Sequence, residues 1–422
     1  MDSVDTPAEP PPRPIVWMAV STYTSLLKTP GVARIIAAQL TARFPFGMLS
    51  LAFLLHIERV HDSYGAAGLV LGAMSIGQAI AGPMTSRLMG VLGMRVVLWT
   101  TLALCSVAVA AIGLFVMPIP LTMGVAFFAG LSMPPIQPAV RTIYPKMVNS
   151  RQLTPLFSLD ASAQEIIWIA GPVAITFVST QIGTVEGILM SVAIMLAGGC
   201  WFISSPEVGR VRIPRSKRRF GTVLARPPVL LATVVGFLLI GSCSAVEAGV
   251  VATFGEGSPL AGIVLAIWSL GSLVGGLALG HVPIGPWATA RRMLIVFIGV
   301  VLSTFMLWSW WGLSLTLLIA GVGIAPALAV LFAIVSASVK FSDTAEAYGW
   351  VGTGQLIGAA LGSAVAGFLI DGVGAVGAFW VAGAFALVGF VVPALAHRIH
   401  PDLRGRDASP IPDTEPVPVQ PS

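Results

Sequence analysis

Runs of about 20 apolar residues recur along the whole chain and constrain its fold more than any other feature. A helix of that length, at about 1.5 Å per residue, crosses the roughly 30 Å hydrocarbon core of a bilayer. The runs occupy residues 34–57, 65–88, 95–116, 120–143, 155–180, 184–205, 228–253, 258–280, 292–309, 313–339, 345–371 and 374–397. The sequence therefore predicts an all-α integral membrane protein with twelve transmembrane helices.

Composition excludes the other large fold classes. The chain of 422 residues is 56% hydrophobic and only 10% charged, whereas an average soluble domain is about 25% charged. A membrane β-barrel would show segments of about ten residues with alternating polarity. These runs are continuously apolar and rich in Gly and Ala, so we expect helices.

The net charge of +5 comes from residues between the apolar runs. If the N-terminus is cytoplasmic, 21 of the 23 Lys and Arg residues lie in or beside cytoplasmic segments, as the positive-inside rule requires. The densest group is Arg210, Arg212, Arg215, Lys217, Arg218, Arg219 and Arg226. We expect this group chiefly to set the topology, with contact to anionic lipid headgroups as the less favoured alternative, and we expect no nucleic-acid partner.

The chain ends and the cysteines carry no catalytic signal. The Pro-rich stretches 1–14 and 405–422 are typical of disordered tails, and the acidic first ten residues do not form a secretory signal. The cysteines are single and far apart, so neither a disulfide nor a metal site is predicted. They are Cys105, Cys200 and Cys243.

A repeat of small residues indicates that the chain consists of two related halves. At an offset of 194, Gly47, Gly68, Ser75, Gly77 and Gly82 match Gly241, Gly262, Ser269, Gly271 and Gly276. At an offset of 191, Gly130, Pro135 and Gly171 match Gly321, Pro326 and Gly362. Duplicated six-helix bundles are a transporter architecture, with the substrate site between the halves.

The repeat divides the chain into five parts. We expect a cytoplasmic tail and lead-in at 1–33, a six-helix bundle at 34–205, a basic cytoplasmic linker at 206–227, a second six-helix bundle at 228–397 and a disordered cytoplasmic tail at 398–422.

Several motifs give the chain a family resemblance over nearly its whole length. They are "RFPFGM" in the first run, "GPMTSRLMGVLGMRVVL" after the second, "MPPIQPAVR" in the fourth and "EAYGWVGTGQLIGAALGSAVAGFLIDG" in the eleventh. The chain resembles the major facilitator superfamily, and more narrowly a bacterial branch of it. The resemblance implies two six-helix bundles related by pseudo-two-fold symmetry, no enzymatic activity, and residence in the bacterial inner membrane with both termini cytoplasmic.

The loop after the second run departs from the family pattern. The family motif G-x-L-x-D-R-x-G-x-R places Gly90 where the Asp helps to latch the cytoplasmic side. The resemblance therefore implies a weaker or differently built latch, to which Arg87 and Arg95 can contribute by pairing with nearby acids or with lipid. In the fifth run, Gly171-Pro172 echoes the family's antiporter motif and favours export slightly.

Two acids in the fifth run, Asp160 and Glu165, lie about 140° apart around a helix and at different depths, about 7 and 15 Å from its cytoplasmic end. Each therefore needs its own partner. Arg141 is near the level of Asp160, which predicts a pair at the cytoplasmic gate. Arg43 is near the level of Glu165, which predicts a pair lining the cavity, either structural or functional.

Glu247 lies about 10 Å below the outer end of the seventh run, with no basic residue at its level in its half. Such an acid tends to hold its proton, so Glu247, with Glu165, is a candidate for proton coupling. His56, at the outer end of the first run, is expected either to meet Glu247 as an outer gate or to be solvated.

One amide and one large aromatic side chain in each half could contact an amphiphilic ligand, although aromatic residues in such helices are more often packing residues. The candidates are Gln164, Trp168, Trp350 and Gln355.

The sequence therefore predicts a secondary active transporter, most simply a monomer that couples protons to export of a small organic or amphiphilic compound. It needs no cofactor and uses the proton gradient. A proton-coupled importer of a sugar or organic acid, and a receptor or accessory protein with the same fold, stay open as alternatives. No phosphate-binding loop or hydrolase motif occurs in the sequence.

Overall fold

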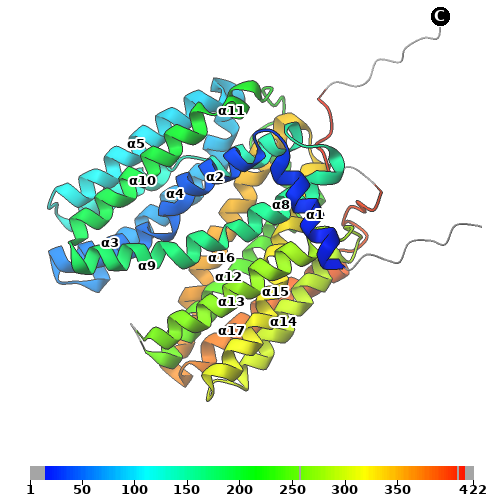
Figure 1. The fold of residues 1–422 in the computed structure, drawn as a ribbon. Coiled ribbons are helices and arrows are strands. Elements are labelled where there is room, and N and C mark those ends of the chain that lie inside the picture. The colour runs from blue at the N-terminus through cyan, green and yellow to red at the C-terminus, as the bar shows by residue number, and fades with distance from the viewer. Residues whose placement is uncertain (1–14, 256–257, 406–407, 414–422) are drawn as a thin grey trace, which may run out of the picture.

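The computed structural model describes residues 15–255, 258–405 and 408–413, and within these ranges the chain forms helices and no strand. The helices assemble into two bundles that meet at one end and diverge toward the other (Figure 1). The fold is thus the all-α, two-bundle membrane fold that the sequence predicts.

The bundles are consecutive in the chain. Before the first bundle lies α1 (Ile15–Lys28). The first bundle contains α2 (Val32–Arg43), η1 (Phe44–Gly47), α3 (Leu49–His61), α4 (Tyr64–Leu92), α5 (Met94–Leu114), α6 (Ile119–Leu131), α7 (Ile136–Ile143), η2 (Tyr144–Lys146), α8 (Ser150–Ala163), α9 (Glu165–Gln181) and α10 (Thr184–Ser204).

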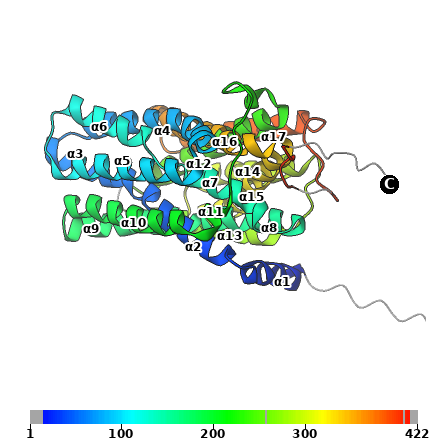
Figure 2. The same ribbon diagram turned by 90° about the horizontal axis from the view of Figure 1, so that it is seen from above.

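The segment between the bundles, here called the linker, carries α11 (Pro206–Arg210) and η3 (Thr222–Ala225). The second bundle contains α12 (Pro227–Phe254), α13 (Pro259–Leu279), α14 (Ala288–Thr304), α15 (Trp310–Ser338), η4 (Phe341–Asp343), α16 (Thr344–Val373) and α17 (Val376–Leu395). We call the end of the bundles at which α10 finishes and α12 begins the linker end, and the opposite end the distal end. Figure 2 shows α1 at the edge of the bundles.

Eleven segments of the described chain are long and apolar enough to cross a membrane. The predicted span 292–309 corresponds to α14, which has only 17 residues and a length of about 26 Å. Arg291 and Arg292 lie in its first two turns and shorten its apolar part. The bundle nevertheless contains it, because α14 packs against α15 and α17.

Three spans that the sequence predicts as continuous helices are interrupted in the structure. The first breaks at η1, which contains Pro45, and the fourth breaks before α7 at Pro134 and Pro135, because proline cannot donate a helical hydrogen bond. The fifth is divided into α8 and α9 at Gln164. Irregular backbone at membrane depth is tolerated where it is buried in protein or lines a cavity, and these breaks fall in such places.

The glycine repeat is a repeat of helix crossings. In the first bundle, a Cβ atom on Gly171 of α9 would lie 3.0 Å from the backbone of Gly47; in the second, one on Gly362 of α16 would lie 2.1 Å from the carbonyl oxygen of Gly241. Equivalent helices therefore cross at equivalent glycines, with backbones too close for a side chain.

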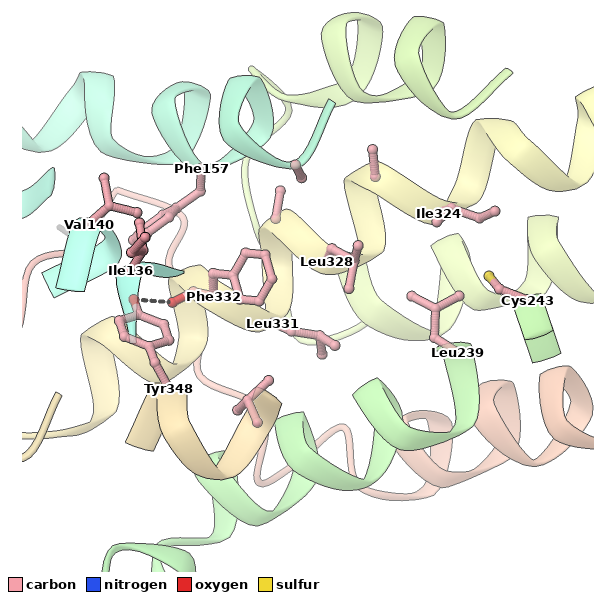
Figure 3. Packing of buried hydrophobic residues seen from close by; sticks show 14 of the residues in the cluster. Ile136, Val140, Phe157, Leu239, Cys243, Ile324, Leu328, Leu331, Phe332 and Tyr348 are labelled. Atoms are coloured by element: carbon pink, nitrogen blue, oxygen red, sulfur yellow. Dashed lines mark hydrogen bonds between the residues drawn. The ribbon is translucent and has the colours of Figure 1, made fainter. Parts of the chain in front are cut away.

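At the linker end the bundles are in direct contact. Ser158 of α8 donates a 2.5 Å hydrogen bond to the carbonyl of Gly276 in α13, and Thr353 of α16 donates one of 2.8 Å to the carbonyl of Ala79 in α4. Aromatic rings also pack across the interface, as Figure 3 shows for Phe157 of one bundle and Phe332 and Tyr348 of the other. These contacts close this end of the interface.

The C-terminal segment is bound to the second bundle, which corrects the prediction of a disordered tail as far as residues 398–405 and 408–413 are concerned. Phe341 and Ile411 are joined by a backbone hydrogen bond of 3.0 Å, and Leu403 donates one of 2.9 Å to Ile284. His400 is buried and bonds to Thr289 at 2.8 Å. Residues 1–14, 406–407 and 414–422 lie outside the described residues.

Replacing Gly362 by Ala should destabilise the folded protein by about 1–3 kcal/mol, because the added methyl group meets the Gly241 backbone. Thermal unfolding in detergent measures this as a lower Tm. Gly367 of the same helix is the matched control, since a Cβ there meets no atom within 4 Å and Gly367→Ala should leave Tm unchanged or raise it. Equal effects at the two positions would contradict the close crossing.

Acidification should loosen the C-terminal segment. Burial lowers the pKa of His400 below its ordinary 6.5, and the charge of Arg292 acts in the same direction. His400 in the detached segment therefore binds a proton more readily than His400 in the attached segment. The contribution of His400 to attachment is fully present above about pH 6.5, and it is lost as the pH falls toward the lower pKa of the attached state. The rate of tryptic cleavage at Arg404 in the wild type, divided by the rate in His400→Gln at the same pH, should rise between about pH 7.5 and 5, because the ratio removes the pH dependence of trypsin itself. Identical pH dependence in both would exclude this role.

Candidate functional site

A cavity of about 980 Å³ lies between the two bundles. The first bundle lines it with η1, α3, α4 and α9, and the second with α12, α13, α15 and α16. Its polar lining residues are Ser50, Ser75, Gln78, Gln164, Glu165, Ser244, Glu247, Ser269, Ser272, Gln355 and Ser363. Most of the remaining lining is aliphatic or aromatic.

The cavity extends toward the distal end. Its lining reaches Gly255, just after α12, and Ile370, near the end of α16. Toward the linker end it stops at Ile240 on α12, 13 residues or about 20 Å after the helix begins. The cavity is therefore accessible from the distal end and closed at the linker end.

Glu165 and Glu247 face this cavity from opposite bundles. Glu165 begins α9, and its Oε1 accepts a 2.7 Å hydrogen bond from the hydroxyl of Ser272 on α13. Glu247 is exposed to the cavity and makes no hydrogen bond or ion pair with any residue in the described part of the chain. One acid thus connects the bundles and the other is free to meet a ligand or a proton.

The predicted Arg43–Glu165 pair is wrong. Arg43 donates hydrogen bonds to Gln39 at 2.8 Å, to Gln137 at 3.1 Å and to Gln164, and lies 3.7 Å from Asp160. Depth along the helix places Arg43 near both acids, but the side of the helix on which each acid lies determines which one it contacts. Asp160 and Gln164 are one turn apart on the face toward α2, whereas Glu165, about 100° further around, faces α13.

Asp160 is the centre of a buried network. Oδ1 accepts hydrogen bonds from Gln39 at 3.0 Å and Tyr144 at 3.1 Å, and Oδ2 accepts one from Arg141 at 3.1 Å. Asp160 is 0% exposed, and Arg43 and Arg141 are each 2% exposed. The predicted contact between Asp160 and Arg141 is present, with the second guanidinium of Arg43 added.

Arg141 also reaches the second bundle. Its guanidinium carbon lies 3.3 Å from the centre of the Phe332 ring on α15. This cation–π contact is made without water, because both residues are buried. Phe332 lies in the aromatic seam of Figure 3, so the Asp160 network is tied to the interface between the bundles.

A second cluster, here called the clamp, joins the linker to both bundles. Arg87 of α4 forms a 2.7 Å salt bridge with Glu346 of α16 and also donates to the backbone carbonyl of Arg218. Arg218 lies 3.6 Å from Asp343, which accepts a 2.6 Å hydrogen bond from Ser216. The clamp is defined as Arg87, Ser216, Arg218, Asp343 and Glu346.

Sequence reasoning missed the two acids of the clamp. Glu346 lies within one of the family motifs, and neither it nor Asp343 is among the predicted site residues. Their position at the start of the eleventh span, at the same end as seven basic linker residues, was the available signal. Arg95 donates to the carbonyls of Ile203 and Ser205 at the end of α10 and forms no ion pair with an acid in the described chain, so of its two predicted partners, acids and lipid, only lipid stays open.

Two further predicted residues lie away from the cavity. His56 is buried in the first bundle, bonded to Thr184 at 3.0 Å and to the carbonyl of Ile112 at 3.1 Å, so it is neither solvated nor directed at Glu247. Trp350 packs on Phe220 of the linker, with ring centres 5.7 Å apart. Gln164, Trp168 and Gln355 do line the cavity.

Replacing Asp160 by Asn should destabilise the protein by about 3–5 kcal/mol, because two guanidinium groups would remain buried without a counter-charge. Purified Asp160→Asn should show a large loss of Tm or of monodisperse protein. Asp371→Asn, on an exposed part of α16, is the matched control and should behave as wild type. A wild-type Tm for Asp160→Asn would mean that the network is not required for stability.

Comparison with known proteins agrees with this architecture. The family model described as Major Facilitator Superfamily matches residues 35–307 and 243–419. No curated protein matches the chain in sequence.

Solved structures share the fold at low identity. The human organic anion transporter MFSD10 (TETRAN) is 17% identical, with a TM-score of 0.66 over 86% of this chain and 98% of that one. The proton:xylose symporter XylE is 12% identical, with a TM-score of 0.68 over 89% of this chain and 97% of that one. A bacterial homologue of the iron transporter ferroportin, in an outward-facing state, is 10% identical, with a TM-score of 0.69 over 86% and 98%.

The family match spans both bundles and the linker between them, and the fold and its central cavity agree with it. The chain belongs to the major facilitator superfamily and is a multi-pass membrane transporter.

Proposed function

We propose that this transporter couples the entry of protons to the export of a small organic or amphiphilic compound. The observation that carries the proposal is the pair of acids, Glu165 and Glu247, which face one cavity from opposite bundles. A carboxylate is costly to hold charged inside a membrane protein, so proton binding and release there are coupled to what else occupies the cavity.

The Glu165–Ser272 hydrogen bond supports a link between protonation and movement. It joins α9 to α13 across the interface, so a proton on Glu165 changes a contact between the bundles. Rocking of one bundle against the other alternately opens the two ends of a central site. In this account the clamp and the Asp160 network hold the linker end shut while the distal end is open.

Orientation follows from the basic linker. With the linker end in the cytoplasm, the seven basic residues of the linker obey the positive-inside rule, and the open cavity faces outward. We propose residence in a bacterial inner membrane with both termini cytoplasmic. Because a single chain supplies both walls of the cavity, we also propose a monomer, with the proton gradient and no cofactor as the energy source. One charge crossing 100 mV carries about 2.3 kcal/mol.

The test is proton flux in proteoliposomes that contain a pH-sensitive dye. A compound that moves protons through the wild type should fail to do so in Glu247→Gln and Glu165→Gln. Glu186→Gln is the matched control, because this exposed acid on α10 does not line the cavity. Flux in Glu247→Gln equal to wild type would remove that residue from coupling, and no proton flux with any compound would favour an accessory role. The direction of transport is tested by comparing uptake of the same compound into inside-out membrane vesicles and into intact cells. Uptake into the vesicles but not into the cells would establish export.

A further inference from the structure

The charge of the cavity identifies a class of ligand. Its described lining contains two carboxylates, on Glu165 and Glu247, and no Lys, Arg or His. The nearest excess positive charge belongs to the Asp160 network, in which Arg43 is 2% exposed and directed at its own three glutamine partners. A solute in the cavity therefore meets negative charge.

Aromatic side chains stand beside these acids. Phe46, Trp168 and Trp268 line the same cavity, and the side chain of Trp168 is 50% exposed overall. The face of an aromatic ring attracts a cation and also packs against apolar groups. The combination suits a solute that carries a positive charge on a hydrophobic body.

Two hydrogen-bond donors in the lining have no acceptor. The indole Nε1 of Trp268 and the amide Nε2 of Gln355 are buried and without a partner among the described residues, and Trp268 is only 6% exposed. An unsatisfied buried donor is costly. Both atoms are covered in this structure, so a ligand in the cavity would remove that cost by drawing either side chain out to an acceptor oxygen.

We propose that the cavity binds organic cations that combine an apolar or aromatic body with a hydrogen-bond acceptor such as an ether or carbonyl oxygen. The positive centre is held by Glu165 and Glu247, and the acceptor by Trp268 and Gln355. This inference rests on the proposed function for its biological meaning, but it concerns binding and can be tested without transport.

The charge is tested with two probes of the same shape and opposite charge, tetraphenylphosphonium and tetraphenylborate, binding to purified wild-type protein. We expect the cation to bind at least about tenfold more tightly, a difference of about 1.4 kcal/mol, because the two carboxylates attract the cation and repel the anion. The preference should fall in Glu165→Gln and Glu247→Gln and persist in Glu186→Gln. Equal binding of the two probes, or preference for the borate, would overturn the proposal without any variant.

The acceptor is tested with (4-methoxyphenyl)triphenylphosphonium and (4-methylphenyl)triphenylphosphonium, which differ in one ether oxygen. The methoxy compound should bind more tightly to the wild type and lose its advantage in Trp268→Phe, which keeps the ring and removes the donor. No methoxy advantage in the wild type would contradict the acceptor part. Cation binding without proton flux would refute the proposed function alone, whereas proton flux with neutral compounds and no cation preference would refute this inference alone.

Discussion

The arrangement of this protein depends on one buried carboxylate placed between two guanidinium groups. Charges are tolerated inside a membrane bundle only when they are paired and hydrogen bonded, and Asp160 meets that condition with Arg43, Arg141, Tyr144 and Gln39. The consequence extends beyond the first bundle. Arg141, held by Asp160, places its guanidinium carbon over the ring of Phe332 and so connects the second bundle to this network.

The break between α8 and α9 allows one segment to serve two purposes. Asp160 and Gln164, on one side, hold Arg43, while Glu165, one residue later, turns to the cavity and to Ser272. The residue that holds the buried arginine, Gln164, and the residue that faces the cavity, Glu165, are therefore adjacent in the chain. In the proposed mechanism, Glu165 can change its charge without removing the counter-charge of the buried arginines, which Asp160 supplies.

Much of the fold could be predicted because it follows from patterns of single residues. The apolar runs predict twelve spans, eleven of which are long and apolar enough to cross a membrane in the described chain. Glycines such as Gly171 and Gly362 recur because backbones cross there in both halves. Depth along a helix correctly joined Arg141 to Asp160. It failed for Arg43, since depth cannot distinguish two acids on different faces.

The positions of His56 and Trp350 were predicted wrongly for a similar reason. Their neighbours come from α10 and from the linker, whose paths depend on tertiary packing. The clamp was missed because its acids and bases are more than 120 residues apart in the chain.

The most direct test of the account measures both ends of α8–α9 and α13 at once, in a protein whose three cysteines are replaced. Spin labels at Ile182 and Leu260 report the distal end, and labels at Arg151 and Val282 report the linker end. The pH is lowered, or an organic cation that binds the protein is added. Double electron–electron resonance should then show that the distance between the two distal labels becomes shorter while the distance between the two linker-end labels becomes longer. If the two distances change together, or neither changes, the bundles do not rock about this cavity and its acids.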